Sequence, residues 1–211
     1  PLYHFEQLWA KGEIAVEDII AEYGGKIDSS TIVKGSHIYN EINEIINLSG
    51  LNLTKIIEIG PGLGSCLRMI KKYKPETRVF LIDLPTSIPY SFTNLLYRFP
   101  EAKFILPNEA NASSNFDKYD FIFLSNEQIH LLKKNEFDLA INSMSFAEMR
   151  KSDIVEYFRL LRRVLKKENL FYCLNAVEKP MIYDGLTVPI RFFEYPWSSK
   201  DWDYKYEISR V

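Results

Sequence analysis

The feature of this sequence that most constrains its fold is a set of alternating glycines directly after a short β-branched stretch. The segment reads Ile56-Ile-Glu-Ile-Gly-Pro-Gly-Leu-Gly64, and a helical pattern follows it to about Lys74. β-Branched residues favour a buried strand, while glycines let the backbone turn tightly with no side chain between it and a ligand. The pattern therefore predicts a strand, a ligand-binding turn and a helix in succession.

Strand and helix patterns continue to alternate after this unit. Apolar runs predict strands at 79–82, 119–124, 139–142 and 170–174, with a weaker candidate at 103–106. Helices are expected over 87–99 and from about 152 to 165, and the aromatic tail 191–208 is expected to add one or two antiparallel strands. This alternation is typical of an α/β protein whose parallel sheet is covered on both faces and binds ligands at the carboxyl ends of its strands.

The first fifty residues form a helical preface to this pattern. Segments 3–11 and 16–23 read as two helices, and isoleucines at 38, 42, 45 and 46 fall on one face of a third that ends before Gly50. We therefore divide the chain into a helical preface, residues 1–50, and a ligand-binding domain, residues 51–211.

The amino-acid composition limits the kinds of partner that the protein is expected to bind. The chain has 26 basic and 28 acidic residues among 211, so nonspecific binding to nucleic acid has no electrostatic driving force. No apolar run approaches the roughly 20 residues that span a bilayer. The two cysteines, Cys66 and Cys173, lie in apolar surroundings without a C-x-x-C pattern, so we expect reduced thiols and a cytoplasmic location.

Two ligand classes compete for the glycine turn. A dinucleotide site favours G-x-G-x-x-G, whereas this chain has G-x-G-x-G with Ser65 next, and Glu58 puts an anion where a pyrophosphate would lie. An anion there suits the positively charged methionyl end of S-adenosylmethionine. Asp83, at the end of the second predicted strand, can accept hydrogen bonds from both ribose hydroxyls of either ligand, so a nicotinamide-dependent dehydrogenase stays open as an alternative.

The segment Ile57 to Gly64 resembles motif I of the class I S-adenosylmethionine-dependent methyltransferases. The segments 81–85 and 137–149, the helix with Tyr157 and the strand before Asn175 are similar to the sugar O-methyltransferase family. The resemblance covers about residues 56 to 175. It implies a three-layer Rossmann-like methyltransferase sandwich, with a mostly parallel sheet and an antiparallel C-terminal edge, and S-adenosylmethionine as cofactor.

The resemblance also implies which residues hold the cofactor. Glu58, Gly60, Gly62 and Gly64 would line the methionyl group, Asp83 the ribose, and residues near Asn126 the adenine. Polar residues after the fourth strand would lie beside the cofactor, with Asn142 and Ser143 contacting it. The histidine base that some O-methyltransferases carry after this strand is replaced by Ala147, so that mechanism does not transfer.

Methylation of a sugar hydroxyl needs a base near the methyl group. Glu148 is the first candidate, although an acidic residue here also suits the start of the helix near Ser152. His37, at the helix before the glycine turn, is the second candidate, and Ser145 and Asn175 are expected to contact substrate.

The predicted function is S-adenosylmethionine-dependent O-methylation of a sugar or glycoside. No metal is expected, because the acidic residues after the fourth strand do not form an oxygen-ligand cluster. For the assembly of the protein, we consider a homodimer. Besides a dehydrogenase, a non-catalytic partner subunit with the methyltransferase fold is the remaining alternative.

Overall fold

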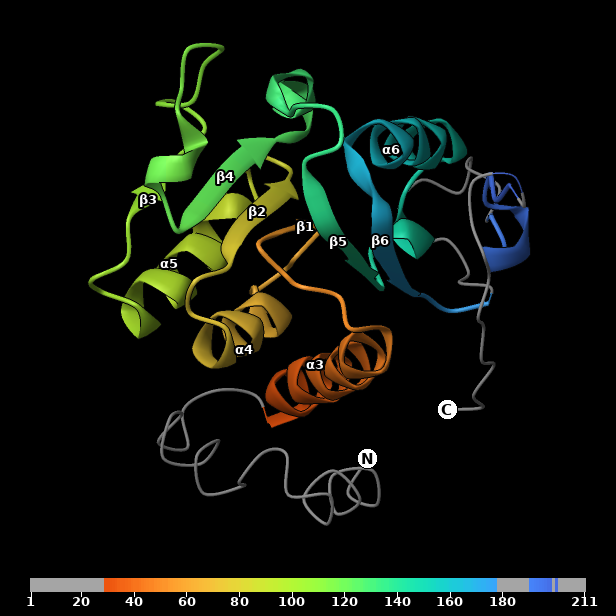
Figure 1. Cartoon of the computed structure of the whole chain (residues 1–211). Coiled ribbons are helices and arrows are strands. Elements are labelled where there is room, and N and C mark those ends of the chain that lie inside the picture. The colour runs from red at the N-terminus through yellow and green to blue at the C-terminus, as the bar shows by residue number, and fades with distance from the viewer. Residues whose placement is uncertain (1–28, 178–189, 199, 201–211) are drawn as a thin grey trace.

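A computed structural model of the chain describes residues 29–177, 190–198 and 200. Strands and helices alternate along it, as Figure 1 shows. The strands are β1 (Lys55–Ile59), β2 (Arg78–Asp83), β3 (Phe104–Ile105), β4 (Phe121–Ser125), β5 (Phe137–Ser143) and β6 (Leu165–Leu174). The α-helices are α3 (Ser29–Ser49), α4 (Ser65–Tyr73), α5 (Ile88–Arg98) and α6 (Lys151–Val164), and the 3-10 helices are η1 (Phe116–Lys118), η2 (Asn126–Leu131), η3 (Phe146–Glu148) and η4 (Phe192–Glu194).

The six strands form one sheet in the order β3-β4-β2-β1-β5-β6. Every pairing between these strands is parallel. The chain runs outward from β1 in both directions, first through β2 and then through β5, so β1 and its neighbours flank the switch point where open α/β sheets bind ligands. The predicted α/β fold with a mostly parallel sheet is confirmed.

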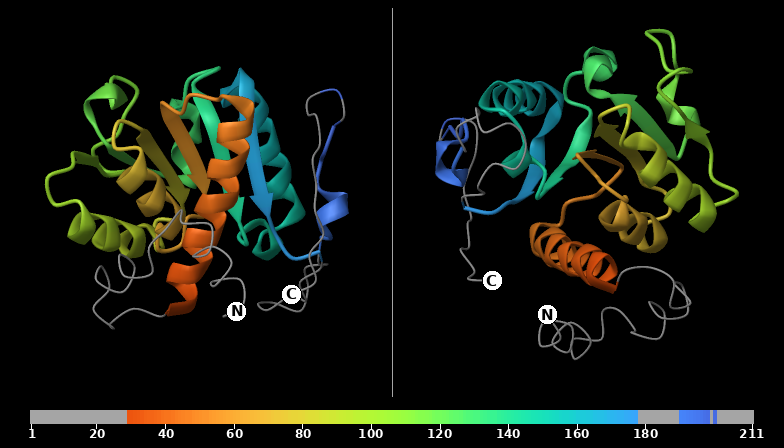
Figure 2. Two further views of the ribbon diagram at one scale, coloured as in Figure 1. Left: turned by 60° about the horizontal axis from the view of Figure 1, so that its bottom comes forward. Right: turned by 180° about the vertical axis from the view of Figure 1, so that it is seen from behind.

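Helices cover both faces of the sheet, which makes three layers (Figure 2). On one face α3, α4 and α5 bury a core that includes Ile42, Leu67 and Leu95. On the other face α6 packs through Phe158 and Leu161 against inward residues of the sheet. Central strand residues such as Ile57 and Leu81 are fully buried, because both faces are covered and both pleats must be apolar.

The expected antiparallel edge is not found in the described part of the C-terminal tail. Residues 192–194 form η4 instead, and Tyr195 and Trp197 pack against Phe158 with ring centroids 6.3 and 4.8 Å away. Pro196 has no N–H for a strand ladder, and aromatic packing on α6 buries these rings without one. The rest of the predicted strand region, residue 199 and residues 201–208, lies outside the described residues.

The helix predicted before Gly50 is confirmed as α3, which runs from Ser29 to Ser49. Ile38, Ile42 and Ile46 of α3 are buried in the same core as the sheet. The two helices predicted at 3–11 and 16–23 lie outside the described residues, and the division of the chain at residue 50 stays a prediction.

Candidate functional site

The predicted site residues converge on the carboxyl edge of the sheet because their strands are paired in register. Ile59 lies opposite Ile82 on one side and Asn142 on the other, and Asp83 lies opposite Ser125. The segments that follow β1, β2, β4 and β5 therefore emerge side by side. The sequence prediction that these strand ends form one site is consistent with this register.

The glycine turn between β1 and α4 is built from left-handed residues. Gly60, Gly62 and Gly64 have φ values of +65°, +58° and +71°, a region that side chains with a Cβ adopt only at a cost. The Gly60 N–H donates to the carbonyl of Ile82 at 2.8 Å, and the Gly64 N–H donates to that of Pro61 at 2.9 Å. These bonds fix the turn against β2 and lead directly into α4.

The three glycines have different surroundings. A Cβ on Gly60 would meet Ser145 Oγ at 2.3 Å, and one on Gly64 would meet Leu95 Cδ1 at 3.2 Å. A Cβ on Gly62 would have no protein atom within 4 Å. The first and third glycines therefore allow close packing within the protein, while the middle one leaves open space beside the backbone.

Two carboxylates flank this turn, one buried and one partly exposed. Glu58 is 3% exposed on β1, and its charge adds to burial in raising the pKa of the nearby Cys66 thiol well above its usual value. Asp83 ends β2 and accepts a hydrogen bond from the Leu84 N–H at 2.8 Å. Burial raises the pKa of Asp83, against the opposing effect of hydrogen bonds from the Leu84 and Gly62 backbone.

Asn142, Ser145 and Asn175 form a hydrogen-bonded network within the protein. The Asn142 amide donates to the Ile59 carbonyl at 3.0 Å and to Ser145 Oγ at 2.5 Å, and its oxygen accepts from Asn175 Nδ2 at 2.8 Å. Ser145 in turn donates to the Ile59 carbonyl at 3.0 Å. These side chains tie the ends of β1, β5 and β6 together, so they order the edge on which a ligand would lie.

The two residues between Asn142 and Ser145 are different. Ser143 has a buried hydroxyl oxygen with no hydrogen-bond partner, which is costly unless a ligand or water supplies one. Met144 has φ +66°, although it has a Cβ, and its N–H donates to the Leu174 carbonyl at 2.6 Å. Backbone strain of this kind clusters at functional sites.

The remaining predicted residues belong to three different elements. Asn126 follows β4 at the start of η2 and is half-buried, while Glu148 ends η3 and is exposed. His37 lies on α3, where its Nε2 is 3.1 Å from Glu41 Oε1. The roles assigned to these residues stay predictions.

Sequence reasoning gave no role to three side chains near the site. Burial, and after it the charges of Asp83 and Asp153, raises the pKa of Tyr157 on α6 to about 12. Tyr172 on β6 donates a hydrogen bond to Glu41. Tyr157 lies in a helix that belongs to the family resemblance, so the sequence did point to it. The pairing of Glu41 with Tyr172 joins residues 131 positions apart and has no local sequence signal.

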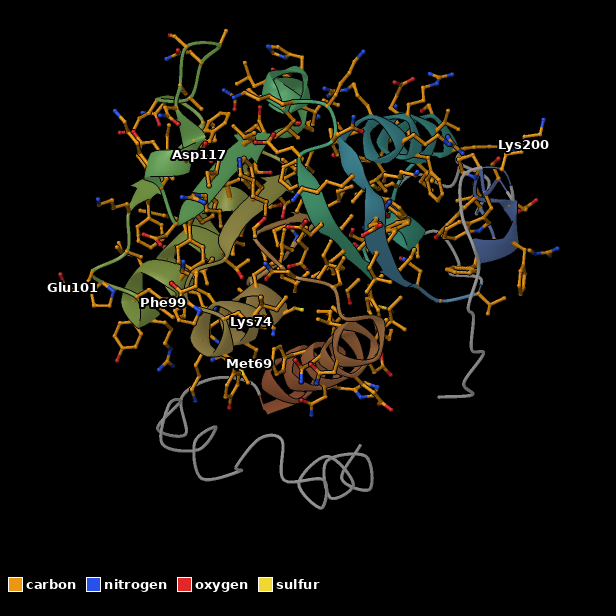
Figure 3. The ribbon with its side chains drawn as sticks, viewed as in Figure 1. Met69, Lys74, Phe99, Glu101, Asp117 and Lys200 are labelled. Carbon is orange, nitrogen blue, oxygen red and sulfur yellow. The ribbon has the colours of Figure 1, made fainter. Side chains whose placement is uncertain are left out.

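Figure 3 shows the side chains, which fill the space between the helices and the sheet. Across residues 29–177, 190–198 and 200, no three His, Cys, Asp or Glu side chains come together in a way that could hold a metal ion. None of the helices in this part of the chain is long and apolar enough to cross a bilayer. Cys66 and Cys173 are both free cysteines.

The fold resembles those of solved methyltransferases. A candidate sarcosine dimethylglycine methyltransferase from Galdieria sulphuraria is similar with a TM-score of 0.50 and 11% identity, over 77% of this chain and 59% of that one. A candidate S-adenosyl-L-methionine-dependent methyltransferase from Methanococcus maripaludis gives 0.48 and 20% identity, over 69% and 57%. A protein from Pyrococcus horikoshii gives 0.47 and 16%, over 65% and 56%.

The chain thus spans less than two thirds of the length of each of these structures. No known protein family matches the sequence, and no curated protein does. At these identities the similarity concerns the fold. Together with the sheet order, it shows that the chain has the Rossmann-like fold also found in this methyltransferase structure.

Proposed function

We propose that the chain binds S-adenosylmethionine at the carboxyl edge of the sheet and transfers its methyl group to a hydroxyl of a sugar or glycoside. The conformation and surroundings of Gly62 are the observation that supports the proposed cofactor binding. Its left-handed backbone has open space where a Cβ would stand, and it lies in the turn between the carboxylates of Glu58 and Asp83.

Each of these groups suits one part of the cofactor. The carboxylate of Glu58 favours the positively charged methionyl end, and the side-chain-free backbone of Gly62 permits close approach. Asp83 can accept hydrogen bonds from the two ribose hydroxyls, since an ionised carboxylate has two acceptor oxygens. Asn126 would contact the adenine, and the buried Ser143 hydroxyl would gain a partner from the methionyl group. The cofactor supplies an electrophilic methyl group.

The residues argue against the dehydrogenase alternative. A nicotinamide dinucleotide would bring a doubly negative pyrophosphate to the glycine turn, where Glu58 is already buried. The third glycine is also one position early for a dinucleotide fingerprint. Both features favour a cationic ligand.

The acceptor half rests on the resemblance to sugar O-methyltransferases. Glu148 is exposed beside the network formed by Asn142, Ser145 and Asn175, and it remains a candidate base. The hydrogen bond between the amides of Asn142 and Asn175 supports a positioning role for these residues. Ser145 contacts the glycine turn directly, which puts it between the cofactor turn and the segment that carries Glu148.

A screen for methyl transfer tests this function. The chain is incubated with radiolabelled S-adenosylmethionine and a panel of methyl glycosides and nucleotide sugars. We expect label in at least one glycoside, and Glu148→Gln should lower turnover on it about 10²- to 10⁴-fold if Glu148 is the base. A folded Gln variant with full turnover would remove Glu148 from that role, and a panel without any product would contradict the acceptor class.

A further inference from the structure

Tyr172, Glu41 and His37 form a cluster of polar side chains that joins α3 to β6. The hydroxyl of Tyr172, on β6, donates to Oε2 of Glu41, and Nε2 of His37 lies 3.1 Å from Oε1 of the same carboxylate. His37 and Glu41 are four residues apart on α3, so they lie on the same side of that helix. Each oxygen of Glu41 thus contacts a polar group, and the two groups come from different elements.

The cluster of Tyr172, Glu41 and His37 is partly buried between α3 and β6. The side chains of His37 and Glu41 are 26% and 39% exposed, so their ion pair is shielded more than a surface pair. Burial and the hydrogen bond to Glu41 raise the pKa of Tyr172 well above its usual value, which keeps its hydroxyl a proton donor. The Tyr172 hydroxyl therefore stays a donor to Glu41 across the physiological pH range.

The register of the sheet shows where this cluster lies along the direction of the strands. Tyr172 pairs with Ile141, and Ile141 pairs with Glu58, so the three residues form one row across β6, β5 and β1. Ile141 and Tyr172 both pack into the core beneath α3. Glu41, bonded to Tyr172, therefore lies over the row that contains Glu58.

His37 lies one helical turn beyond Glu41, toward the carboxyl edge. α3 runs opposite to the strands, because the chain reverses between its end at Ser49 and the start of β1 (Figure 2). One turn of helix is about 5.4 Å, close to the rise of about 6.6 Å over two strand residues. His37 is thus near the height of Gly60, two residues after Glu58.

Ser143 belongs to the same level and face. It follows Ile141 by two residues, so its side chain points to the same side of the sheet. It pairs with Leu174, which follows Tyr172 by two residues. Its hydroxyl oxygen is buried without a partner. A polar ligand between α3 and the strand ends would satisfy this oxygen, and His37 stands on the helix that faces it.

The Glu41 carboxylate, 3.1 Å from Nε2, favours the neutral tautomer of His37 that carries its proton on Nε2. When the imidazole is neutral, the Nε2 proton is donated to the carboxylate, and Nδ1 carries the lone pair. A carboxylate at one ring nitrogen stabilises the imidazolium that forms when the other nitrogen takes a proton. Cys66 on α4 and Cys173 on β6 also lie close enough to Tyr172 to act on it electrostatically, and Glu58 on β1 acts in the same way on Cys66.

We propose that Glu41 and Tyr172 are positioning residues that hold His37, in place of Glu148, as the base for the acceptor hydroxyl. This inference rests on the proposed methyltransferase function and names the proton acceptor for it. The hydroxyl O–H bond breaks and its proton goes to Nδ1 of His37, while the oxygen forms a bond to the methyl carbon. The methyl–sulfur bond breaks with its electron pair on sulfur, which leaves a neutral thioether, and the positive charge passes to the imidazolium beside Glu41.

Nitrogen NMR of the histidine ring tests the arrangement without any acceptor. In a His4→Gln/His130→Gln background of the full chain, only His37 reports. At a pH where the ring is neutral, we expect one fixed tautomer with the proton on Nε2, and averaged ring nitrogens in Glu41→Ala. Glu44→Ala, an exposed glutamate on the same helix, is the matched control and should leave the signals unchanged.

Addition of S-adenosylhomocysteine should then shift the His37 signals. An unchanged tautomer in Glu41→Ala would overturn the proposal, as would calorimetric binding of S-adenosylhomocysteine with no response from His37. If S-adenosylhomocysteine does not bind at all, the proposed function fails, and the tautomer measurement still decides whether Glu41 holds His37.

Kinetics on the first glycoside accepted in the screen separates positioning from simple packing. Tyr172→Phe keeps the ring in the core but removes the hydroxyl, so kcat should fall about 10- to 100-fold while the affinity for S-adenosylhomocysteine stays the same. His37→Gln should lower kcat more. Tyr97→Phe, at a 76% exposed position on α5, is the control. Full kcat in folded Tyr172→Phe and Glu41→Ala would show that the pair only packs α3 on β6.

Discussion

Gly60 and Ser145 are in such close contact that residue 60 has no room for a methyl group. A Cβ there would lie 2.3 Å from Ser145 Oγ and 2.4 Å from Ser145 Cβ. The same hydroxyl donates to the carbonyl of Ile59, so the glycine turn and the segment after β5 are joined at one point. This contact links the part of the site that suits the cofactor to the part that carries the candidate acceptor residues.

Replacing Gly60 should therefore cost more than its backbone conformation explains. Gly50 is a matched reference, because its φ of +68° is close to the +65° of Gly60 and a Cβ there meets nothing within 4 Å. We expect Gly50→Ala to lower the free energy of unfolding by about 1 kcal/mol and Gly60→Ala by about 1–3 kcal/mol more. Urea denaturation measures both, and equal losses would mean that the contact with Ser145 is unimportant.

Gly62 should affect ligand binding with a smaller effect on the fold. Gly62→Val and Gly50→Val place the same side chain on left-handed backbone with open space around it. We expect similar losses of stability, since the strain is similar, but only Gly62→Val should lose binding of S-adenosylhomocysteine in calorimetry. Wild-type affinity in folded Gly62→Val would place the ligand elsewhere.

Asp83 should contribute to affinity through its charge. Asp83→Ala is expected to weaken S-adenosylhomocysteine by about 1–3 kcal/mol, the usual loss for hydrogen bonds to a charged acceptor, with an unchanged circular dichroism spectrum. Burial raises the pKa of Asp83 above the ordinary value of 3.8, so affinity should begin to fall at a higher pH than an exposed aspartate would give. Binding that is independent of pH down to pH 4 would contradict this role.

Asp138 should stabilise the opposite edge of the sheet. It accepts hydrogen bonds from the Thr54 N–H at 2.8 Å, the Lys55 N–H at 3.0 Å and Lys166 Nζ at 2.5 Å. Burial alone would raise its pKa, but these partners hold the pKa below the ordinary value. The stabilisation is therefore complete above the unfolded pKa of about 3.9 and is lost as the pH falls through the lower folded pKa.

Urea denaturation at several pH values tests this assignment. Asp138→Ala should lower the free energy of unfolding by about 2–3 kcal/mol at pH 7, and the difference from wild type should shrink in acid. Asp117→Ala is the control, because that side chain is 56% exposed and its ion pair with Lys55 should be worth less than about 1 kcal/mol. An Asp138→Ala effect of the same size at pH 3 would contradict the mechanism.

The order of strands and helices could be predicted because buried parallel strands leave strong local signals. Ile56 to Ile59 and Val79 to Ile82 are apolar on both pleats except at Glu58, and the glycines mark the turn that follows. The short β3 was the weakest prediction, since two residues carry little periodicity. The tail around Tyr195 was mistaken for a strand because aromatic residues favour strands and packing on a helix equally.

The site was predictable only where neighbouring residues carry it. The glycine turn and Asp83 follow directly from strand ends, whereas the network of Asn142, Ser145 and Asn175 depends on the register between β1, β5 and β6. Likewise, the sequence around Glu41 shows only a charged residue on a helix. Its hydrogen bond with Tyr172 depends on how α3 packs on β6. Such contacts between distant segments have no signature in a single sequence.

Calorimetric titration of the 211-residue chain with S-adenosylhomocysteine and, separately, with NADH tests the central claim most directly. Glu58 and the open backbone at Gly62 predict that S-adenosylhomocysteine binds at one site per chain, with binding lost in Gly62→Val, and that NADH gives no binding heat. Binding of NADH without binding of S-adenosylhomocysteine would contradict the account, and so would the absence of binding by either ligand.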